Sequence, residues 1–360
     1  MSAIRPLEPE DIPAVAALYE RVMRSGTHTA EPAIKDFFRD TVLMQPWADP
    51  EIPSLVYDDP DAGILGFLGS HVRRLVFDGR PVRVGCSGQL VADPDAAKPG
   101  VGALLMRAHM RGGQDVSTTD GATPTVRAMW ERLGGVTLPL ASIGWTRVLR
   151  PARFAGAIAG RRRGREPRRS AAVLDALAGP LTRRALRPPE PEGSTESLTS
   201  ELLLELVELG SWRLRPAYDR EYLDWLFALM GAVPGRGELR RLAVRDGHGN
   251  PLGWAVYYRA RGGISQVQQI AALGDPGQVI DHVLWDASQG GSAAVQGRLE
   301  PALVPPLLDR RCVFRRTEWA LARTDDAELL GAITAGDPLL TRMDGEWWMG
   351  PHLIPSAAPA

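Results

Sequence analysis

The pattern of apolar and polar positions predicts a succession of short strands and amphipathic helices in the N-terminal part of the chain. Apolar runs bounded by turn residues predict strands at 4–7, 54–58, 64–75, 82–91, 116–119 and 137–149. Apolar residues that recur on one face predict helices at 10–22, 34–42, 100–111 and 124–133. Strands that follow one another through tight turns such as Asp78-Gly79 favour an α+β fold with a mostly antiparallel sheet.

Residues 89–106 combine a strand, a turn that contains Pro and Gly, and a helix that begins near Gly100 and Gly102. The first N–H groups of a helix have no partner within the helix, and its dipole favours negative charge there. Two interpretations follow from the residues alone: a cradle for a pyrophosphate, or an ordinary strand–loop–helix connection.

The order of these elements over about residues 3–149 resembles the GNAT acetyltransferase superfamily. The family's signature places Arg or Gln, two residues, Gly, one residue and Gly or Ala at the start of a helix. The corresponding residues run from Ala97 to Gly102, so both small positions match, and Lys98 stands beside the unmatched Ala97. A later helix at 125–135, which ends in two glycines, also resembles the family's pattern.

The resemblance implies acetyl-CoA or another acyl-CoA as co-substrate, lying between two splayed strands. Its pyrophosphate would meet the N–H groups of the loop and helix start, and its pantetheine arm would pair with strand backbone. Carried onto this sequence, the cofactor-binding residues are Leu90, Val91, Lys98, Pro99, Gly100, Val101, Gly102, Ala103 and Thr125.

Acyl transfer needs a group that takes a proton from the acceptor and one that gives a proton to the thiolate. The family often uses a Tyr as the acid, and the aligned residue here is Trp130, which is no proton donor at neutral pH. His28, Asp93 and Asp120 are the candidates for the base. Transfer without a dedicated base is the alternative, because proximity alone lowers the barrier substantially.

From about residue 200 the order of elements repeats, which predicts two GNAT-like domains, each a mixed, mostly antiparallel sheet flanked by helices. The second copy has no Gly-x-Gly and carries Asp275 where a pyrophosphate would lie, so it is interpreted as degenerate. The expected organisation is a domain at 1–149, an Arg- and Pro-rich linker at 150–199 and a second domain at 200–360. The arrangement resembles tandem GNAT-like and Fem-type transferases.

The composition of the chain excludes some classes of function. The net charge of −1 argues against binding of nucleic acid by the whole protein, and no apolar run is long enough to span a bilayer. Cys86 and Cys312 lack the spacing of a metal site and lie in apolar surroundings, so free thiols, no metal and a cytoplasmic location are expected. The pair Trp347-Trp348 indicates either a sugar site or a core contact.

The sequence therefore predicts a CoA-dependent N- or O-acyltransferase. Its acceptor would be a small molecule, a glycan or a peptide, and an oligomer is possible. Two alternatives stay open: a sensor or scaffold that binds acyl-CoA without turnover, and a Fem-type aminoacyl transferase, for which the basic linker would be functional.

Overall fold

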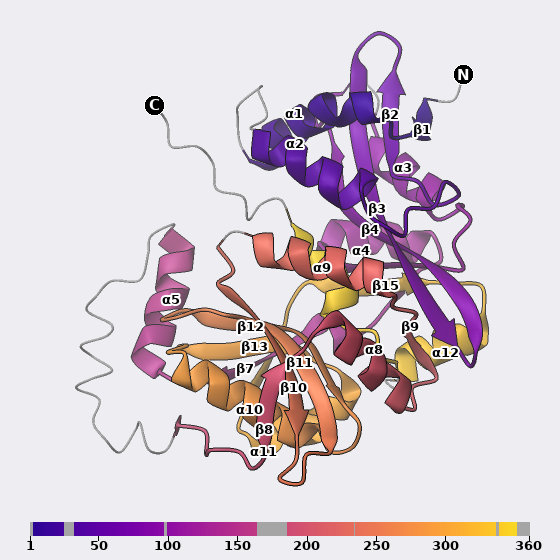
Figure 1. Cartoon of the computed structure of the whole chain (residues 1–360). Coiled ribbons are helices and arrows are strands. Elements are labelled where there is room, and N and C mark those ends of the chain that lie inside the picture. Colours follow the sequence, from indigo (N-terminus) through magenta and orange to yellow (C-terminus); the bar gives the residue numbers. More distant parts are fainter. Residues whose placement is uncertain are drawn as a thin grey trace.

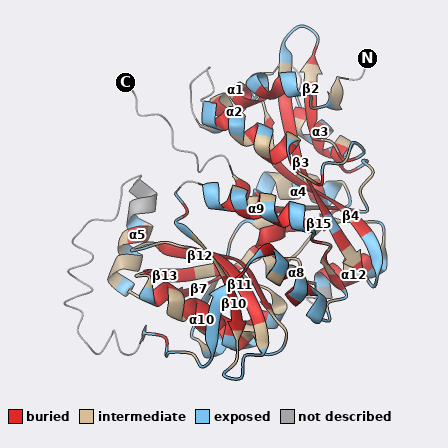
Figure 2. Ribbon diagram, in the orientation of Figure 1, coloured by how far each residue is buried: buried red, intermediate tan, exposed pale blue. Residues whose placement is uncertain are grey.

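Two β-sheets with helices on their faces make up the protein (Figure 1). The computed structural model describes residues 3–24, 32–96, 99–163, 186–233, 235–335 and 338–350. Each sheet combines one parallel pair of strands with antiparallel pairs, which confirms the predicted α+β class. Buried residues follow the strands and the inward sides of the helices in both halves (Figure 2).

The first sheet contains the strands predicted in the N-terminal part of the chain and two that come from further along it. Its order is β1 (Ile4–Pro6), β2 (Leu55–Asp59), β3 (Gly63–Phe77), β4 (Arg80–Ala92), β5 (Val116–Ala122), β15 (Trp319–Arg323) and β6 (Val136–Thr137), with β9 (Leu214–Pro216) paired to β3. Only β4 and β5 run parallel. Asp78 and Gly79 both have positive φ and form the tight turn between β3 and β4, as the sequence predicts.

Helices cover both faces of this sheet because its strands alternate apolar residues between the faces. On one face α1 (Ile12–Met23) and α2 (Pro32–Phe38) pack on Val56, Phe67 and Val91. On the other, α3 (Val101–His109) and α4 (Pro124–Arg132) pack on Leu55, Tyr57, Leu65 and Leu68. The π-helical segment η2 (Arg39–Leu43) continues α2, and α12 (Ala327–Ala335) packs near the far ends of β3 and β4.

The second sheet repeats this plan. Its order is β14 (Val313–Arg316), β7 (Ile143–Val148), β13 (Ala294–Arg298), β12 (Ile264–Ala272), β11 (Pro251–Arg259), β10 (Glu238–Arg245) and β8 (Ser194–Ser197). Its helices are α5 (Pro151–Arg163), α8 (Ser200–Leu209), α9 (Arg220–Ala232), α10 (Pro276–Gln289) and α11 (Val304–Asp309). The parallel pair β12–β13, joined through α10, corresponds to β4–β5, joined through α3.

The two halves exchange their last strands. The segment predicted as one strand at 137–149 is divided, since β6 lies in the first sheet and β7 lies between β13 and β14 of the second. The corresponding segment near residue 320 is divided in the same way, since β14 stays in the second sheet and β15 pairs with β5. The sheets therefore do not divide the chain at residue 149, where the sequence placed the domain boundary.

Two segments pass from one sheet to the other: the connection between β6 and β7, and the connection between β14 and β15. Ser142 lies where these two connections meet. Its carbonyl accepts the N–H of Thr317 at 2.9 Å, and its hydroxyl accepts the N–H of Ala320 at 3.0 Å. The hydroxyl also donates to the carbonyl of Leu138 at 2.8 Å. Ser142 is only 1% exposed, so these bonds satisfy backbone groups that water does not reach.

Residues 338–350, called the C-terminal segment below, and α9 fill the space between the sheets. Residues 338–350 contain two short 3₁₀ helices, η5 (Arg342–Asp344) and η6 (Trp347–Met349). Trp348 is fully buried in a core that also contains Trp47 and Val72 of the first half and Trp254 of the second. No helix in the described ranges combines the length and apolar character needed to cross a membrane.

Candidate active site

The first feature of the site is a gap between two parallel strands. β4 and β5 pair only from Val84 to Cys86, opposite Val116 to Thr118. Beyond this point both strands continue, but no further pairing between them is seen in the described residues. Gln89, at φ 49°, marks an irregularity in the pairing of β4 with β3 that bends this part of the strand. The backbone of Leu90 and Val91 therefore has no partner on the β5 side.

The second feature is the start of α3, which follows directly from β4. Gly100 is the N-cap residue at φ 86°, a conformation that favours glycine, and no side chain caps the helix. The N–H groups of Val101, Gly102 and Ala103 have no hydrogen-bond partner among the residues that the structure describes. These unpaired donors and the helix dipole fit a phosphate-bearing ligand.

Gly102 leaves room at this helix start. A Cβ atom there would lie 3.9 Å from Ala92 and Leu90, so packing within the protein does not require a glycine at this position. Pro99 is exposed beside the helix, and Thr125 is exposed in the first turn of α4. Lys98 lies outside the described residues. The helix start thus has both free donors and open space beside them.

The equivalent helix of the second half differs at the same point. The N-cap residue of α10 is Asp275, whose carboxylate accepts the N–H of Gly277 at 2.8 Å. This side chain satisfies a donor that a phosphate would need and adds a negative charge. The start of α3 therefore has free donors and no acidic cap, whereas the start of α10 has an acidic cap.

The third feature is the side chain of Glu346, which lies between the diverging strands. Its carboxyl oxygens accept the Thr119 hydroxyl at 2.6 Å and the N–H groups of Asp120 and Gly121 at 2.9 and 3.0 Å. A Cβ atom on Gly88 of β4 would lie 2.7 Å from the Cγ of Glu346. The C-terminal segment thus places a carboxyl group against both edges of the gap.

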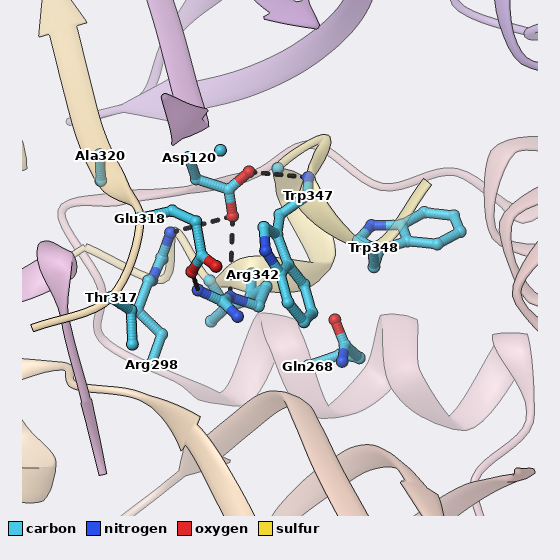
Figure 3. Close-up of polar contacts among 12 residues, drawn as sticks. Asp120, Gln268, Arg298, Thr317, Glu318, Ala320, Arg342, Trp347 and Trp348 are labelled. Atoms are coloured by element: carbon cyan, nitrogen blue, oxygen red, sulfur yellow. Dashed lines mark hydrogen bonds and ion pairs between the residues drawn. The ribbon is translucent and has the colours of Figure 1, made fainter. Parts of the chain in front are cut away.

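Asp120 belongs to a buried group of charges with Arg298 and Arg342 (Figure 3), and it also contacts Glu346. One Asp120 oxygen accepts the backbone N–H groups of Glu346 and Trp347, both at 2.9 Å. The other lies 3.7 Å from the Arg298 guanidinium and 3.9 Å from that of Arg342. The side chains of Asp120, Arg298 and Arg342 are each less than a tenth exposed.

These surroundings shift the pKa values of the two carboxyl groups in opposite directions. Burial, together with the charge of Asp120, raises the pKa of Glu346 well above its ordinary value. Burial also acts to raise the pKa of Asp120, but the hydrogen bond with Glu346 and the charges of Arg342 and Arg298 outweigh it and lower that pKa. Two interacting carboxyls titrate as a pair, and in this pair Glu346 binds the proton more strongly than Asp120 does.

Other buried polar groups hold this arrangement in place. The His71 ring contacts the carbonyl of Thr41 at 3.2 Å and the side chain of Gln89 at 2.8 Å, so it fixes the bend of β4. Burial lowers the pKa of His71 to about 4, so the ring is neutral. The buried Arg73 donates to the carbonyl of Asp344 at 2.9 Å, which anchors the C-terminal segment.

The candidate bases predicted from the sequence lie in different places. Asp120 is part of the carboxyl pair at the gap. Asp93 lies at the end of β4, where it forms an ion pair with Arg21 and accepts the N–H of Asp95 at 3.0 Å. His28 lies outside the described residues. Trp130 is fully buried on α4 in the core beneath the sheet, which explains how the chain accommodates an indole at this position.

Sequence reasoning missed Glu346, Arg298 and Arg342. These residues come from the second half of the chain, more than 170 positions after Asp120, and no spacing rule connects them with it. The acidic and aromatic tail around Trp347 was the one visible signal, and it was interpreted as a sugar site or a core contact. The two cysteines are free and buried, and the Cys86 thiol lies 3.5 Å from Glu346.

Comparisons with known proteins show the class of fold. Neither a protein-family model nor a curated protein sequence matches the chain. Among solved structures, it is similar to a probable N-acyltransferase from Enterococcus faecalis, with a TM-score of 0.57 and 10% identity over 89% of this chain and 71% of that one.

Two further solved structures are similar over most of their length. A GCN5-related N-acetyltransferase from Anabaena variabilis gives a TM-score of 0.56 and 10% identity, over 90% of this chain and 72% of the other. Eis1 from Mycobacterium abscessus gives a TM-score of 0.51 and 17% identity, over 91% of this chain and 74% of the other. The protein therefore has the fold of the GCN5-related N-acetyltransferases, as the sequence resemblance implied.

Proposed function

We propose that the protein transfers an acyl group, acetyl in the first instance, from CoA to an amine or hydroxyl group of an acceptor. The observation that carries this proposal is the open gap between β4 and β5, which runs from the uncapped start of α3 to the carboxyl of Glu346. The likeness to solved acetyltransferases supports acyl transfer in general.

The residues that hold the co-substrate are those with free backbone groups. The N–H groups from Gly100 to Ala103 receive the pyrophosphate, together with Lys98 and Pro99 of the preceding loop. The backbone of Leu90 and Val91 pairs with the amides of the pantetheine arm, and the Thr125 hydroxyl lies at the start of α4 for a further hydrogen bond. When bound, acetyl-CoA supplies an activated acyl group whose thioester bond is exchanged for an amide or ester bond.

Glu346 is the proposed proton donor to the leaving thiolate and the proposed proton acceptor from the amine or hydroxyl group. The reaction removes a proton from the acceptor and adds one to the departing sulfur, so the enzyme itself is unchanged overall. Because its pKa is raised, Glu346 keeps its proton to a higher pH than an ordinary glutamic acid; in the proposed reaction it gives this proton to the thiolate and then recovers a proton from the acceptor. Asp120 stays ionised beside it and keeps the proton on Glu346.

Calorimetric titration of acetyl-CoA and CoA tests the proposed binding site. Gly102→Glu places a carboxylate at the helix start and should abolish binding, whereas the matched Gly102→Ala should fold and bind, because a Cβ atom has space there. Release of free thiol in the presence of amine and hydroxyl acceptors then tests turnover. No binding by the wild-type protein, or equal binding by Gly102→Glu, would contradict the proposal.

A second candidate is a protein that binds acyl-CoA without turnover. It is favoured by the buried Trp130, which leaves α4 without the proton donor that the family often has there. Tight binding with no thiol release from any acceptor would support it. The acceptor classes that we consider are small molecules, glycans and peptides, and the two buried free thiols fit a cytoplasmic location.

A further inference from the structure

A cavity lies beside the carboxyl pair, on the side of the second sheet. Its volume is about 110 Å³, so only a small molecule or part of one can enter it. Its polar lining includes Thr146, Gln266, Gln296, Glu318, Arg342 and, from β14, Arg315; Trp347 forms part of its wall. Strands β7, β12 and β13 supply the first three of these residues, and the exchanged connection and C-terminal segment supply Glu318 and Arg342.

This cavity reaches the same strand end as the candidate active site. Trp347 follows Glu346 directly, and its backbone N–H donates to Asp120 at 2.9 Å. Glu318 precedes Trp319, which pairs with Ala122, the last residue of β5. A molecule in the cavity therefore lies next to the gap in which we place the thioester.

Arg342 lies in the wall of this cavity within ion-pair distance of Asp120 and Glu318, but without a hydrogen bond to either. It is only 6% exposed, yet its guanidinium donates no hydrogen bond to any residue in the described part of the chain. The nearest acidic oxygens, those of Asp120 and Glu318, are 3.9 and 4.0 Å away, and the group lies 4.0 Å from the Trp347 ring (Figure 3). A guanidinium has five N–H donors, and leaving them unpaired away from bulk water is costly.

Other buried arginines of the protein do not share this property. Arg73 donates to the carbonyl of Asp344 at 2.9 Å, and Arg236 donates to the side chain of Gln266 at 2.6 Å. Arg147 donates to the carbonyl of Leu186 at 3.4 Å. Arg342 therefore differs from these arginines in that it donates no hydrogen bond among the described residues, although Asp120 and Glu318 lie within ion-pair distance.

The charges around Arg342 define the ligand that would complete the site. A planar guanidinium with free donors matches a carboxylate, which accepts two parallel hydrogen bonds. The charged residues that line the cavity are Arg315, Arg342 and Glu318, so the lining carries a net positive charge that favours an anionic group. The Glu318 carboxylate, 45% exposed at 4.0 Å from Arg342, offers a complementary site for an ammonium group.

We propose that this cavity binds a small amine-bearing carboxylic acid, an amino acid in the simplest case, with its carboxylate on Arg342. That such a molecule is the acyl acceptor rests on the proposed function, but its binding does not. The neutral side chains of Thr146, Gln266 and Gln296 line the remaining space and are available for hydrogen bonds to its other groups.

Calorimetric titration of the full-length protein without CoA tests this proposal. Each proteinogenic L-amino acid is titrated beside its α-carboxamide, which keeps the shape and removes the charge. At least one amino acid should bind, and its amide should bind at least about tenfold more weakly, because a hydrogen-bonded charge is lost. Failure of every amino acid to bind, or equal binding of acid and amide, would overturn the proposal.

Variants locate the bound molecule. Arg342→Gln should weaken binding by at least about tenfold, because the charge-assisted bonds to the ligand are lost. Arg316→Gln is the matched control, since Arg316 is exposed nearby, stacks on Trp319 and does not line the cavity. Unchanged affinity in a folded Arg342→Gln protein would overturn the assignment, and the comparison of acid with amide needs no variant to fold.

The titrations with amino acids and with acetyl-CoA test the cavity assignment and the proposed acyl transfer separately. Binding of acetyl-CoA without binding of any amino acid would overturn the cavity assignment and leave acyl transfer standing. Binding of an amino acid without binding of acetyl-CoA would support the cavity assignment and overturn the proposed function. Thiol release that depends on the bound amino acid would support both.

Discussion

Glu346 and Asp120 hold each other through reciprocal hydrogen bonds, although 226 residues separate them in the chain. The backbone N–H of Asp120 donates to the carboxyl of Glu346 at 2.9 Å, and the backbone N–H of Glu346 donates to the carboxylate of Asp120 at 2.9 Å. The pair fastens the C-terminal segment to β5 and leaves one proton between two buried carboxyls. Structure and proposed chemistry therefore depend on the same two side chains.

Glu346→Gln should separate chemistry from structure. Glutamine has the shape of a protonated glutamic acid but gives no proton to a leaving group, so the rate of thiol release should fall about 10²- to 10⁴-fold. Binding of acetyl-CoA at α3 should be retained. Glu205→Gln, at an exposed position on α8, is the control and should leave the rate unchanged. A Glu346→Gln protein with full activity would exclude Glu346 from proton transfer.

The same substitution should change how stability depends on pH. The pKa of Glu346 is raised in the folded protein, so its favourable contribution is complete below the ordinary value of 4.5 and is lost as the pH rises through the folded-state value. Glutamine does not ionise, so Glu346→Gln should become more stable relative to the wild type as the pH is raised. Urea unfolding at a series of pH values measures the difference, and a difference independent of pH would contradict the pKa shift.

Asp120→Asn should destabilise the fold strongly. Removing this carboxylate leaves Arg298 and Arg342 buried without their shared counter-charge, which costs about 3–5 kcal/mol in comparable buried pairs. Asp93→Asn is the matched comparison: its partner Arg21 is partly exposed, so the loss should stay below about 1 kcal/mol. Urea unfolding compares the two variants, and equal losses would show that Asp120 is not the centre of the charged group.

Ser142→Ala tests the crossing of the exchanged strands. The change removes the hydroxyl that accepts the N–H of Ala320 and donates to the carbonyl of Leu138. A buried N–H without a partner costs about 1–3 kcal/mol, so the free energy of unfolding should fall by that amount. Ser142→Thr keeps the hydroxyl and serves as a comparison. An unchanged midpoint for Ser142→Ala would mean that the crossing does not depend on this side chain.

Trp130→Phe tests whether the indole on α4 has a chemical role. The ring is fully buried, and its N–H has no partner among the described residues, so its replacement removes an unpaired donor and leaves a small space. We expect a loss of stability below about 1.5 kcal/mol and no change in the rate of thiol release. A large fall in rate in a protein of wild-type stability would contradict a purely structural role.

The local sequence pattern was sufficient to predict the parts of the site that lie close together in the sequence. The strand that ends near Val91, the turn and the helix at Gly100 were predicted because a glycine at a helix start and a run of apolar residues act within a few positions. The α+β class followed from the order of such elements. The unpaired N–H groups at α3 and the capped helix at Asp275 agree with the contrast predicted between the two halves.

The apolar pattern of the sequence did not predict how distant strands pair. The segment from Thr137 to Val148 reads as one apolar strand, but apolar alternation states only that a strand is half buried and not which sheet it joins. The break at Ser142 that sends β6 and β7 to different sheets depends on hydrogen bonds from residues 317 and 320. Contacts at this separation leave no periodic trace in the sequence.

By itself the sequence determined the elements, the class of fold and the glycine-bearing start of α3, since these depend on local geometry and short-range periodicity. The tertiary structure alone decided that Glu346 enters the gap between β4 and β5, that burial and the charge of Asp120 raise its pKa, and that Arg342 lines a cavity. The physical reason is that burial and charge set these properties, and both arise only when distant segments pack against each other.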